Sequence, residues 1–277
     1  MFYGRESSAK SSIALKIISE YQKRGELCAY IDIEHSLSAD WAEKLGVNLN
    51  DLVIAQPDSL EKSIDITDSL TRSGEFGLIV YDSLAMAVPE EELEKSAFDQ
   101  QMALQARLFS KAMRKLMSAL QPKDLSDKST YNKTTVLLIN QVREDIGNPY
   151  SRSYTYSGGH ALRHSARIIV EFARGDYIKD KNQEPIGLEI KFRTVKNKTW
   201  YPYRTGMIKL YFDGRIDNSE TIIAEAKKIG IIKQHGAMYE YNNIKERGFD
   251  NFVKIVLEKN LLDEILEKVY NYYKKGC

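Results

Sequence analysis

The sequence predicts an α/β fold, with a mainly parallel central sheet flanked by helices. Strand-like and helix-like segments alternate through the first two thirds of the chain. The segments 27–33 and 77–82 are almost continuously apolar, which is typical of strands that are buried on both faces. A Gly- and Ser-containing segment, 4–11, leads directly into the first helix-like segment. These three observations favour a doubly covered sheet with polar groups at its edge.

The elements of the first half follow from periodicity and from their end signals. Apolar side chains recur at helical spacing over 11–24, and Gly25 ends that run. A short helix about 39–45 ends at Gly46, and 52–55 is strand-like. A helix over 59–72 closes at Gly74 and precedes the strand 77–82.

The second half begins with a long helix at about 100–120 and a polar loop over 121–134. A strand is predicted at 135–139, and 142–159 is predicted to be a long loop because it lacks apolar periodicity. Alternating patterns predict antiparallel strands at 166–173, 186–195 and 206–212. Lys- and Glu-rich helices follow at 219–229, 250–258 and 261–275. We therefore divide the chain into a core, 1–217, and a small C-terminal helical or α+β domain, 218–277.

Composition limits the classes of protein. The 277 residues are 43% hydrophobic and 29% charged, which suits a protein with a buried core. Forty basic against 39 acidic residues give a net charge of +1, which excludes a histone-like polycation but permits a local basic stripe. Two cysteines, Cys28 and Cys277, are too few for a disulfide framework. No signal layout or membrane-length apolar run is present, so we expect a cytoplasmic protein without a membrane partner.

The segment 4–11 resembles a phosphate-binding P-loop. Its residues are Gly4, Arg5, Glu6, Ser7, Ser8, Ala9, Lys10 and Ser11. They match the pattern G-x-x-x-x-G-K-[ST] except that Ala9 replaces the second glycine. Backbone N–H groups would form a nest for phosphates, Lys10 would reach the β- and γ-phosphates, and Ser11 would ligate Mg²⁺. The alternative is a Ser-rich turn with a solvated lysine.

Polar side chains end three of the predicted strands. Asp82 would position Mg²⁺, and Glu34 would act as general base for water. Gln141 would contact a γ-phosphate and relay its presence to the following loop. Because carboxyl ends of parallel strands meet at one edge, we expect these groups near the P-loop. The alternative readings are a helix N-cap or surface acid for Glu34 and an ordinary strand-ending acid for Asp82.

Basic and aromatic residues are interleaved in the predicted loop 142–159, as suits single-stranded nucleic acid. The residues are Arg143, Tyr150, Arg152, Tyr154, Tyr156, Gly158 and Gly159. A disordered surface loop is the alternative. Arg107 and Arg114 lie seven residues apart on one helix face and either support DNA or form a solvated face. Lys196 and Lys198 share one side of a strand end, which is either an exposed edge or a pair that reaches for phosphate.

Together these motifs resemble the bacterial RecA recombinase family, from residue 4 to about residue 241. The supporting segments are 4–11, 31–37, 45–47, 56–58, 80–83, 104–107, 139–143, 158–162, 195–198 and 236–241. The resemblance implies binding of ATP and Mg²⁺, filament formation on single-stranded DNA, and pairing with duplex DNA. It also implies strand exchange in recombination, DNA repair and the SOS response.

The resemblance implies roles residue by residue. Lys10 and Ser11 match the P-loop lysine and hydroxyl, Glu34 the water-activating glutamate, Asp82 the Mg²⁺ aspartate and Gln141 the γ-phosphate sensor. Trp41 would stack on adenine, and Lys196 and Lys198 would reach the ATP of a neighbouring subunit. Arg107 and Arg114 match DNA-proximal arginines, and Arg163 lies in the subunit-contact segment. The DNA loops correspond to about 95–102 and to 142–157.

The chain also departs from the family pattern, at Ala9, Ser38 and His164, in a longer 121–134 segment and in lacking an acidic tail. We expect the N-terminal polymerisation helix and the strand before the P-loop to be missing, leaving unpaired strand edges and weaker filaments. Three functions therefore stay open. They are an active recombinase ATPase, a non-catalytic RecA-like DNA-binding fragment or filament modulator, and a helicase-like motor. Residues 195–198 and Gly158–Gly159 argue against the motor.

Overall fold

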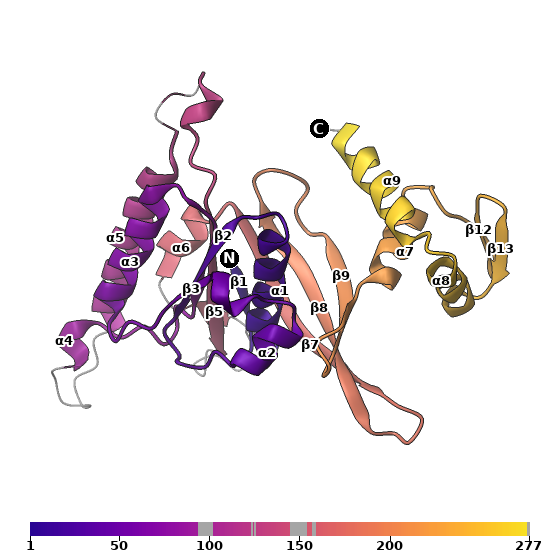
Figure 1. The fold of residues 1–277 in the computed structure, drawn as a ribbon, viewed down its shortest axis with the longest axis horizontal. Coiled ribbons are helices and arrows are strands. Elements are labelled where there is room, and N and C mark those ends of the chain that lie inside the picture. Colours follow the sequence, from indigo (N-terminus) through magenta and orange to yellow (C-terminus); the bar gives the residue numbers. More distant parts are fainter. Residues whose placement is uncertain (94–101, 123, 125, 145–153, 157–158, 276–277) are drawn as a thin grey trace. The chain divides into compact units, whose positions relative to one another are not determined.

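The computed structural model describes residues 1–93, 102–122, 124, 126–144, 154–156 and 159–275 (Figure 1). The chain forms two compact units. Unit 1 comprises 1–174 and 193–204, and unit 2 comprises 175–192 and 205–277. Strands β7 (Ile168–Lys179) and β8 (Pro185–Asn197) contribute residues to both units.

Unit 1 is built on a parallel sheet whose strands run in the order β3-β2-β4-β5-β1-β7. All the pairs between these neighbours are parallel. The bounds are β1 Phe2–Gly4, β2 Leu27–Asp32, β3 Leu52–Ala55, β4 Phe76–Asp82 and β5 Thr135–Glu144. The alternation of strands and helices in the sequence therefore produces the predicted α/β architecture.

Helices cover both faces of this sheet (Figure 1). On β2, Ala29 and Ile31 pack into the core cluster that contains Phe109 of α5. On the opposite face, the thiol of Cys28 lies 3.9 Å from the carbonyl oxygen of Ile18 in α1. The helices are α1 Lys10–Gln22, α2 Ala39–Lys44, α3 Leu60–Ser73, α4 Glu90–Leu93, α5 Met102–Leu120 and α6 Gly159–Ser165. Short 3₁₀ turns occupy Leu49–Asp51 and Lys128–Thr130.

The expectation of a missing strand before the P-loop is wrong. Residues Phe2–Gly4 form β1, which pairs with β5 on one side and β7 on the other. Only three residues are needed, because the register places Gly4 between Gln141 and Phe172, where the loop begins. The backbones of β5 and β7 therefore have the partner that the sequence analysis expected them to lack.

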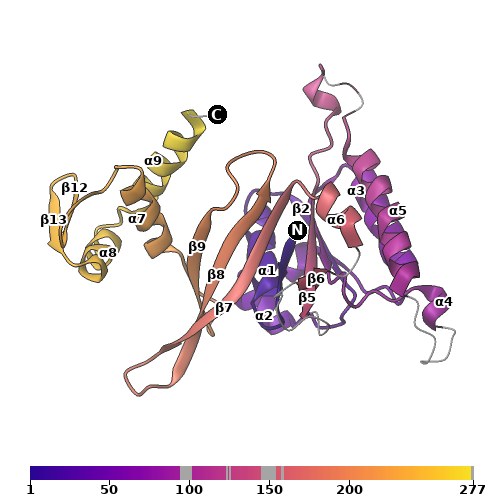
Figure 2. The same ribbon diagram turned by 180° about the vertical axis from the view of Figure 1, so that it is seen from behind.

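The prediction of one long loop over 142–159 is also corrected. Strand β5 continues to Glu144 and pairs antiparallel with β6, Tyr154–Tyr156 (Figure 2). The register places Val142 beside Tyr156 and Glu144 beside Tyr154. Helix α6 then begins at Gly159 and packs against α5. Sequence periodicity missed this hairpin because its second strand has only three residues.

Unit 2 contains β9 (Thr205–Tyr211), which lies between β8 and β10 (Ile216–Asp217). Helices α7 (Ser219–Lys228), α8 (Phe249–Glu258) and α9 (Leu262–Lys275) match the three predicted helices. A three-stranded antiparallel sheet accompanies them, with β11 Lys233–His235, β12 Met238–Tyr241 and β13 Ile244–Arg247. Their apolar faces form a core centred on Phe252, Val256 and Ile265, all fully buried.

In the part of the chain that the structure describes, no helix is both long and apolar enough to cross a lipid bilayer.

Candidate active site

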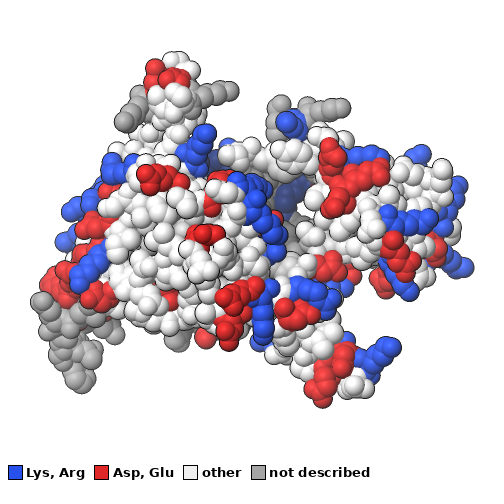
Figure 3. Space-filling view, in the orientation of Figure 1, with Lys and Arg blue, Asp and Glu red and all other residues white. Residues whose placement is uncertain are grey.

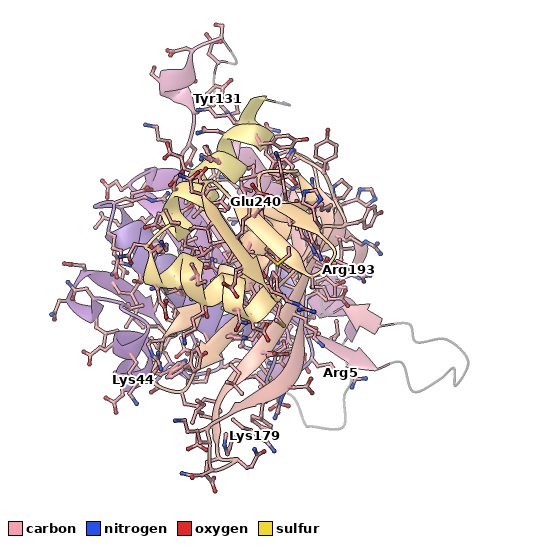
Figure 4. All side chains as sticks on the ribbon, turned by 90° about the vertical axis from the view of Figure 1, so that its right-hand side faces the viewer. Arg5, Lys44, Tyr131, Lys179, Arg193 and Glu240 are labelled. Carbon is pink, nitrogen blue, oxygen red and sulfur yellow. The ribbon has the colours of Figure 1, made fainter. Side chains whose placement is uncertain are left out.

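The P-loop segment connects β1 to α1. Gly4 is required there, because a Cβ on it would meet the carbonyl oxygen of Phe172 at 2.2 Å. Ala9, immediately before α1, has φ 59° and ψ 24°, the left-handed conformation that the family's glycine would adopt without strain. A Cβ in this conformation costs about 1 kcal/mol. The loop therefore keeps its shape despite the substitution. Arg5, Glu6 and Ser7 are exposed (Figure 4 labels Arg5), whereas Ser8 is buried.

Lys10 reaches back across this loop. Its Nζ donates to the carbonyl oxygens of Arg5 at 2.8 Å and Gly4 at 3.2 Å, and to the Ser8 hydroxyl at 3.2 Å. Burial lowers the pKa of Lys10, and the charges of Asp82, Glu34 and Glu6 act in the opposite direction. The ammonium group is thus held over the loop by neutral oxygens, which a phosphate would replace with stronger, charge-assisted bonds.

Asp82 lies at the carboxyl end of β4 and is buried at 2% exposure. The Tyr30 hydroxyl donates to its Oδ2 at 2.6 Å, and Ser11 also hydrogen-bonds to this carboxyl. Burial raises the pKa of Asp82, the negative charges of Glu34 and Asp32 add to that rise, and the hydrogen bonds oppose it. A hydroxyl and a carboxylate side by side are the oxygen ligands that Mg²⁺ prefers, and Mg²⁺ commonly takes only one or two protein ligands beside phosphates. Ser11 and Asp82 therefore fit a Mg²⁺ ion bound with a nucleotide.

Glu34 follows β2 and is half-buried. Its Oε1 accepts a hydrogen bond from the Gln141 amide at 2.9 Å and another from the Ser83 hydroxyl. The alternative reading of Glu34 as a helix N-cap does not hold, because Ser38 caps α2. The structure thus brings the two predicted strand-end groups, Glu34 and Gln141, into contact across 107 residues of sequence.

A buried aspartate that the sequence analysis did not single out for a role holds the Glu34 turn. Asp32, fully buried, accepts hydrogen bonds from the backbone N–H groups of Ser36 at 3.1 Å and Leu37 at 3.2 Å. The Gln56 amide donates to the same carboxylate at 3.0 Å. An acid within a buried apolar strand is the signal that could have identified it, since buried carboxylates need partners.

Trp41 lies on α2 beside the first turn of α1. Its indole Nε1 donates to the Ser12 hydroxyl at 3.0 Å, one residue beyond the P-loop. Ser38, where the family has an acidic residue, accepts a hydrogen bond from the Trp41 backbone N–H and begins α2. These contacts place the indole next to the P-loop helix.

Lys196 and Lys198 lie apart from the P-loop of their own chain. The Lys196 Nζ donates to the carbonyl oxygens of Arg163 at 2.6 Å and His164 at 3.0 Å, at the end of α6. Lys198 is exposed, and its backbone N–H donates to Arg167, just before β7 begins. Strand β7 runs parallel to β1, and the P-loop follows the carboxyl end of β1. Lys196 and Lys198 therefore lie near the amino ends of these strands, opposite to the P-loop. Burial lowers the pKa of Lys196, as do the charges of Lys198 and Arg163.

The predicted DNA-contacting residues that the structure describes lie on α5, on β5 and at the start of α6. Arg107 and Arg114 are both exposed on α5, and exposed Lys111 lies between them on the same face, an addition that sequence reasoning missed. Arg143 lies on β5 and Gly159 begins α6. Tyr150, Arg152, Gly158 and the first predicted DNA loop, apart from Met102 at the start of α5, lie outside the described residues. Over the face in Figure 3, basic and acidic side chains are interspersed, in keeping with the near-zero net charge.

The sequence has clear relatives. The profile of the RecA N-terminal domain family matches residues 1–217. Protein RecA of Rickettsia canadensis is 37% identical over 268 residues, which cover 96% of this chain and 75% of that protein. Protein RecA of Methylobacterium sp. is 39% identical over 241 residues, covering 87% of this chain and 64% of that protein.

The fold has solved counterparts as well. The crystal structure of the RadB recombinase superposes with a TM-score of 0.51 at 17% sequence identity, covering 78% of this chain and 88% of that one. This likeness concerns the fold, whereas the sequence matches concern descent. The P-loop, the strand-end carboxylates and the sequence matches agree, and the chain belongs to the RecA family.

Proposed function

We propose that this protein is an ATP-dependent DNA recombinase that binds single-stranded DNA as a filament and promotes its pairing and strand exchange with homologous duplex DNA. The observation that carries the proposal is the 2.9 Å hydrogen bond from the Gln141 amide to the Glu34 carboxylate, at the edge of the sheet where the P-loop begins. In this arrangement Glu34 would be the base for water and Gln141 the phosphate sensor. Their contact beside the P-loop favours a nucleotide-dependent switch over a site that only binds phosphate.

Each residue has a step in the proposed hydrolysis of ATP. The P-loop N–H groups and Lys10 would bind the phosphates, and Trp41 would contact the base. A water oxygen would bond to the γ-phosphorus while the bond to the β–γ bridging oxygen breaks. Glu34 would accept a proton from that water, and Lys10 would balance the charge on the departing oxygen. Mg²⁺ held by Ser11 and Asp82 would supply charge neutralisation of the phosphates.

Strand β5 offers a connection between the nucleotide and DNA. Gln141 lies on β5, and the β5–β6 hairpin begins at the next residue, Val142. When Gln141 turns from Glu34 to a γ-phosphate, the start of this hairpin would shift with it. Arg107, Lys111 and Arg114 on α5 would contact DNA phosphates. Lys198, and Lys196 after release from α6, would reach the ATP of a neighbouring subunit, since both lie at the edge away from their own P-loop.

The proposal is tested by joint-molecule formation. The purified chain is incubated with a labelled single strand, a homologous duplex and ATP, and a heterologous duplex serves as the control. We expect joint molecules with the homologous duplex alone, and none with the Lys10→Ala variant. The proposal is contradicted by a folded sample that binds the strand but forms no joint molecules.

The second candidate, a non-catalytic RecA-like DNA-binding module or filament modulator, draws on the left-handed conformation of Ala9. If this strain weakens phosphate binding, DNA affinity should be sensitive to salt but indifferent to ATP. Fluorescence anisotropy of a labelled single strand, with and without ATP, separates the two candidates. The recombinase requires tighter binding with ATP.

A further inference from the structure

A buried tyrosine hydroxyl contacts the aspartate that we assign to Mg²⁺. Tyr30 lies on β2 and is 1% exposed, and Asp82 ends the neighbouring strand β4 at 2% exposure. The hydroxyl donates to Asp82 Oδ2 at 2.6 Å. This distance is ordinary for a hydroxyl bonded to a carboxylate, which is among the stronger hydrogen bonds in proteins.

The Tyr30 hydroxyl has two side-chain partners, Asp82 and Ser11, both within the proposed Mg²⁺ site. Tyr30 lies on the α1 face of the sheet, because its neighbours Ala29 and Ile31 pack in the opposite core. Because its ring is enclosed, the hydroxyl cannot leave these partners without becoming a buried group that lacks a hydrogen bond. With Oδ2 occupied by this donor, the carboxylate can turn only by breaking the bond. The hydrogen bond therefore fixes which way the carboxyl group faces.

We propose that Tyr30 is a positioning residue for the Mg²⁺ site: it holds Asp82 so that the carboxylate is oriented toward Ser11 and the P-loop before nucleotide arrives. This inference rests on the proposed function, because it presumes that Asp82 and Ser11 hold Mg²⁺ with ATP. It adds a residue outside the P-loop and strand-end motifs. Tyr30 would act through Asp82 and not by touching the ion.

The chain offers a matched control in the adjacent strand. Tyr81 is also buried, at 2% exposure, and its hydroxyl shares a 2.7 Å hydrogen bond with Ser63 of α3. It packs in the core on the other face, with Phe109. Tyr30→Phe and Tyr81→Phe each remove one buried hydroxyl without changing the ring, so their effects on folding should be similar.

The experiment measures nucleotide affinity against Mg²⁺ concentration by isothermal titration calorimetry, using a non-hydrolysable ATP analogue. We expect Tyr30→Phe to raise the Mg²⁺ concentration for half-maximal affinity about tenfold, as is typical when a residue that orients a metal ligand is removed. Tyr81→Phe should leave it unchanged. Affinity measured without Mg²⁺ should be the same in all three proteins, since the P-loop is intact.

A double-mutant cycle with Asp82→Asn isolates the pair. In the Asp82→Asn background, Tyr30→Phe should cause no further change, because the carboxylate it orients is gone. If wild-type binding depends on Mg²⁺ but Tyr30→Phe leaves the Mg²⁺ requirement unchanged or lowers it, this inference is overturned. The proposed function is then unaffected. A wild type that binds nucleotide without any dependence on Mg²⁺, or not at all, contradicts the proposed function and this inference with it.

Discussion

At the scale of single residues, each of the three carboxylates at the P-loop edge of the sheet is held by its own set of donors. Asp32 is held by two backbone N–H groups and the Gln56 amide, Asp82 by the Tyr30 and Ser11 side chains, and Glu34 by Gln141 and Ser83. Because buried carboxylates are costly without partners, these donors keep the acids in defined positions. The acids of the proposed nucleotide site thus have defined hydrogen-bond partners within the protein itself.

Two of these acids, Asp82 and Glu34, were singled out from the sequence, whereas Asp32 and some of the donors were not. Asp82 and Glu34 follow apolar strands directly in sequence, so a sequence pattern finds them. Tyr30 and Asp82 are 52 residues apart, and Gln56 and Asp32 are 24 apart. Their contacts depend on which strands are neighbours in the sheet, and periodicity carries no information about strand order.

Substitutions at the two ends of the loop, Gly4→Ala and Ala9→Gly, should affect the free energy of unfolding differently. Gly4→Ala should lower the free energy of unfolding by roughly 1–3 kcal/mol, because its Cβ would meet the Phe172 carbonyl oxygen at 2.2 Å. Ala9→Gly relieves the left-handed strain but adds freedom to the unfolded chain, so we expect a net change within about 1 kcal/mol. Urea denaturation measures both. Equal stability of Gly4→Ala and wild type would contradict the close approach of β1 and β7.

The thiol of Cys28 reports on the packing of β2 against α1. It is fully buried, and burial raises its pKa to about 11 from an ordinary value of 9.0. A raised thiol pKa contributes stability that is present below pH 9.0 and is lost as the pH rises toward 11. In a Cys277→Ser variant at about pH 8, we expect Cys28 to resist Ellman's reagent until denaturant is added. Rapid labelling of the native protein would contradict this packing.

At the scale of elements, α5 has an apolar face and a basic face. Phe109, Ala112, Met113 and Leu116 are buried, whereas Arg107, Lys111 and Arg114 are exposed. No acidic residue interrupts the 19 positions of the helix. The sequence predicted the helix and its two arginines because a period of 3.6 residues determines both faces. The hairpin that follows β5 was missed because a three-residue strand shows no such period.

The basic face of α5 yields a charge-matched test. Arg107→Ala and Arg114→Ala should each weaken single-stranded DNA binding and reduce the salt dependence by about 0.7 in log–log slope, the contribution of one phosphate contact. Lys115→Ala removes the same charge from the same helix, but Lys115 already pairs with Asp65 at 3.1 Å. Its slope should stay near that of wild type. Equal effects of all three substitutions in an anisotropy titration would argue for bulk charge and against a defined contact.

At the scale of the whole molecule, the described residues form a separate hydrophobic cluster in each of the two units. One lies between the unit 1 sheet and α3, α5 and α6, and the other joins α7–α9 to the β11–β13 sheet. The predicted boundary between 217 and 218 stays a prediction. The compact units assign 175–192 and 205–217 to the C-terminal body, a division that depends on strand pairing and not on composition.

Separate cores predict separable effects on stability. Phe252→Ala should destabilise unit 2 by about 3–5 kcal/mol, because Phe252 is fully buried there. Nucleotide binding by unit 1 should persist, and nucleotide should still raise the unfolding temperature of that unit. Phe109→Ala, the equivalent change in unit 1, should remove the nucleotide effect. Loss of nucleotide binding in Phe252→Ala would contradict independent cores.

The rate of ATP hydrolysis with and without single-stranded DNA tests the central claim most directly. We predict that DNA stimulates turnover by the wild-type chain and that Glu34→Gln, which keeps the shape of the side chain but cannot accept the proton, lowers turnover by about 10²–10⁴-fold while nucleotide binding is retained. A folded wild-type protein that binds ATP and DNA but shows no DNA-stimulated turnover would contradict the account. Equal turnover by Glu34→Gln and wild type would contradict the role of Glu34 and Gln141 in it.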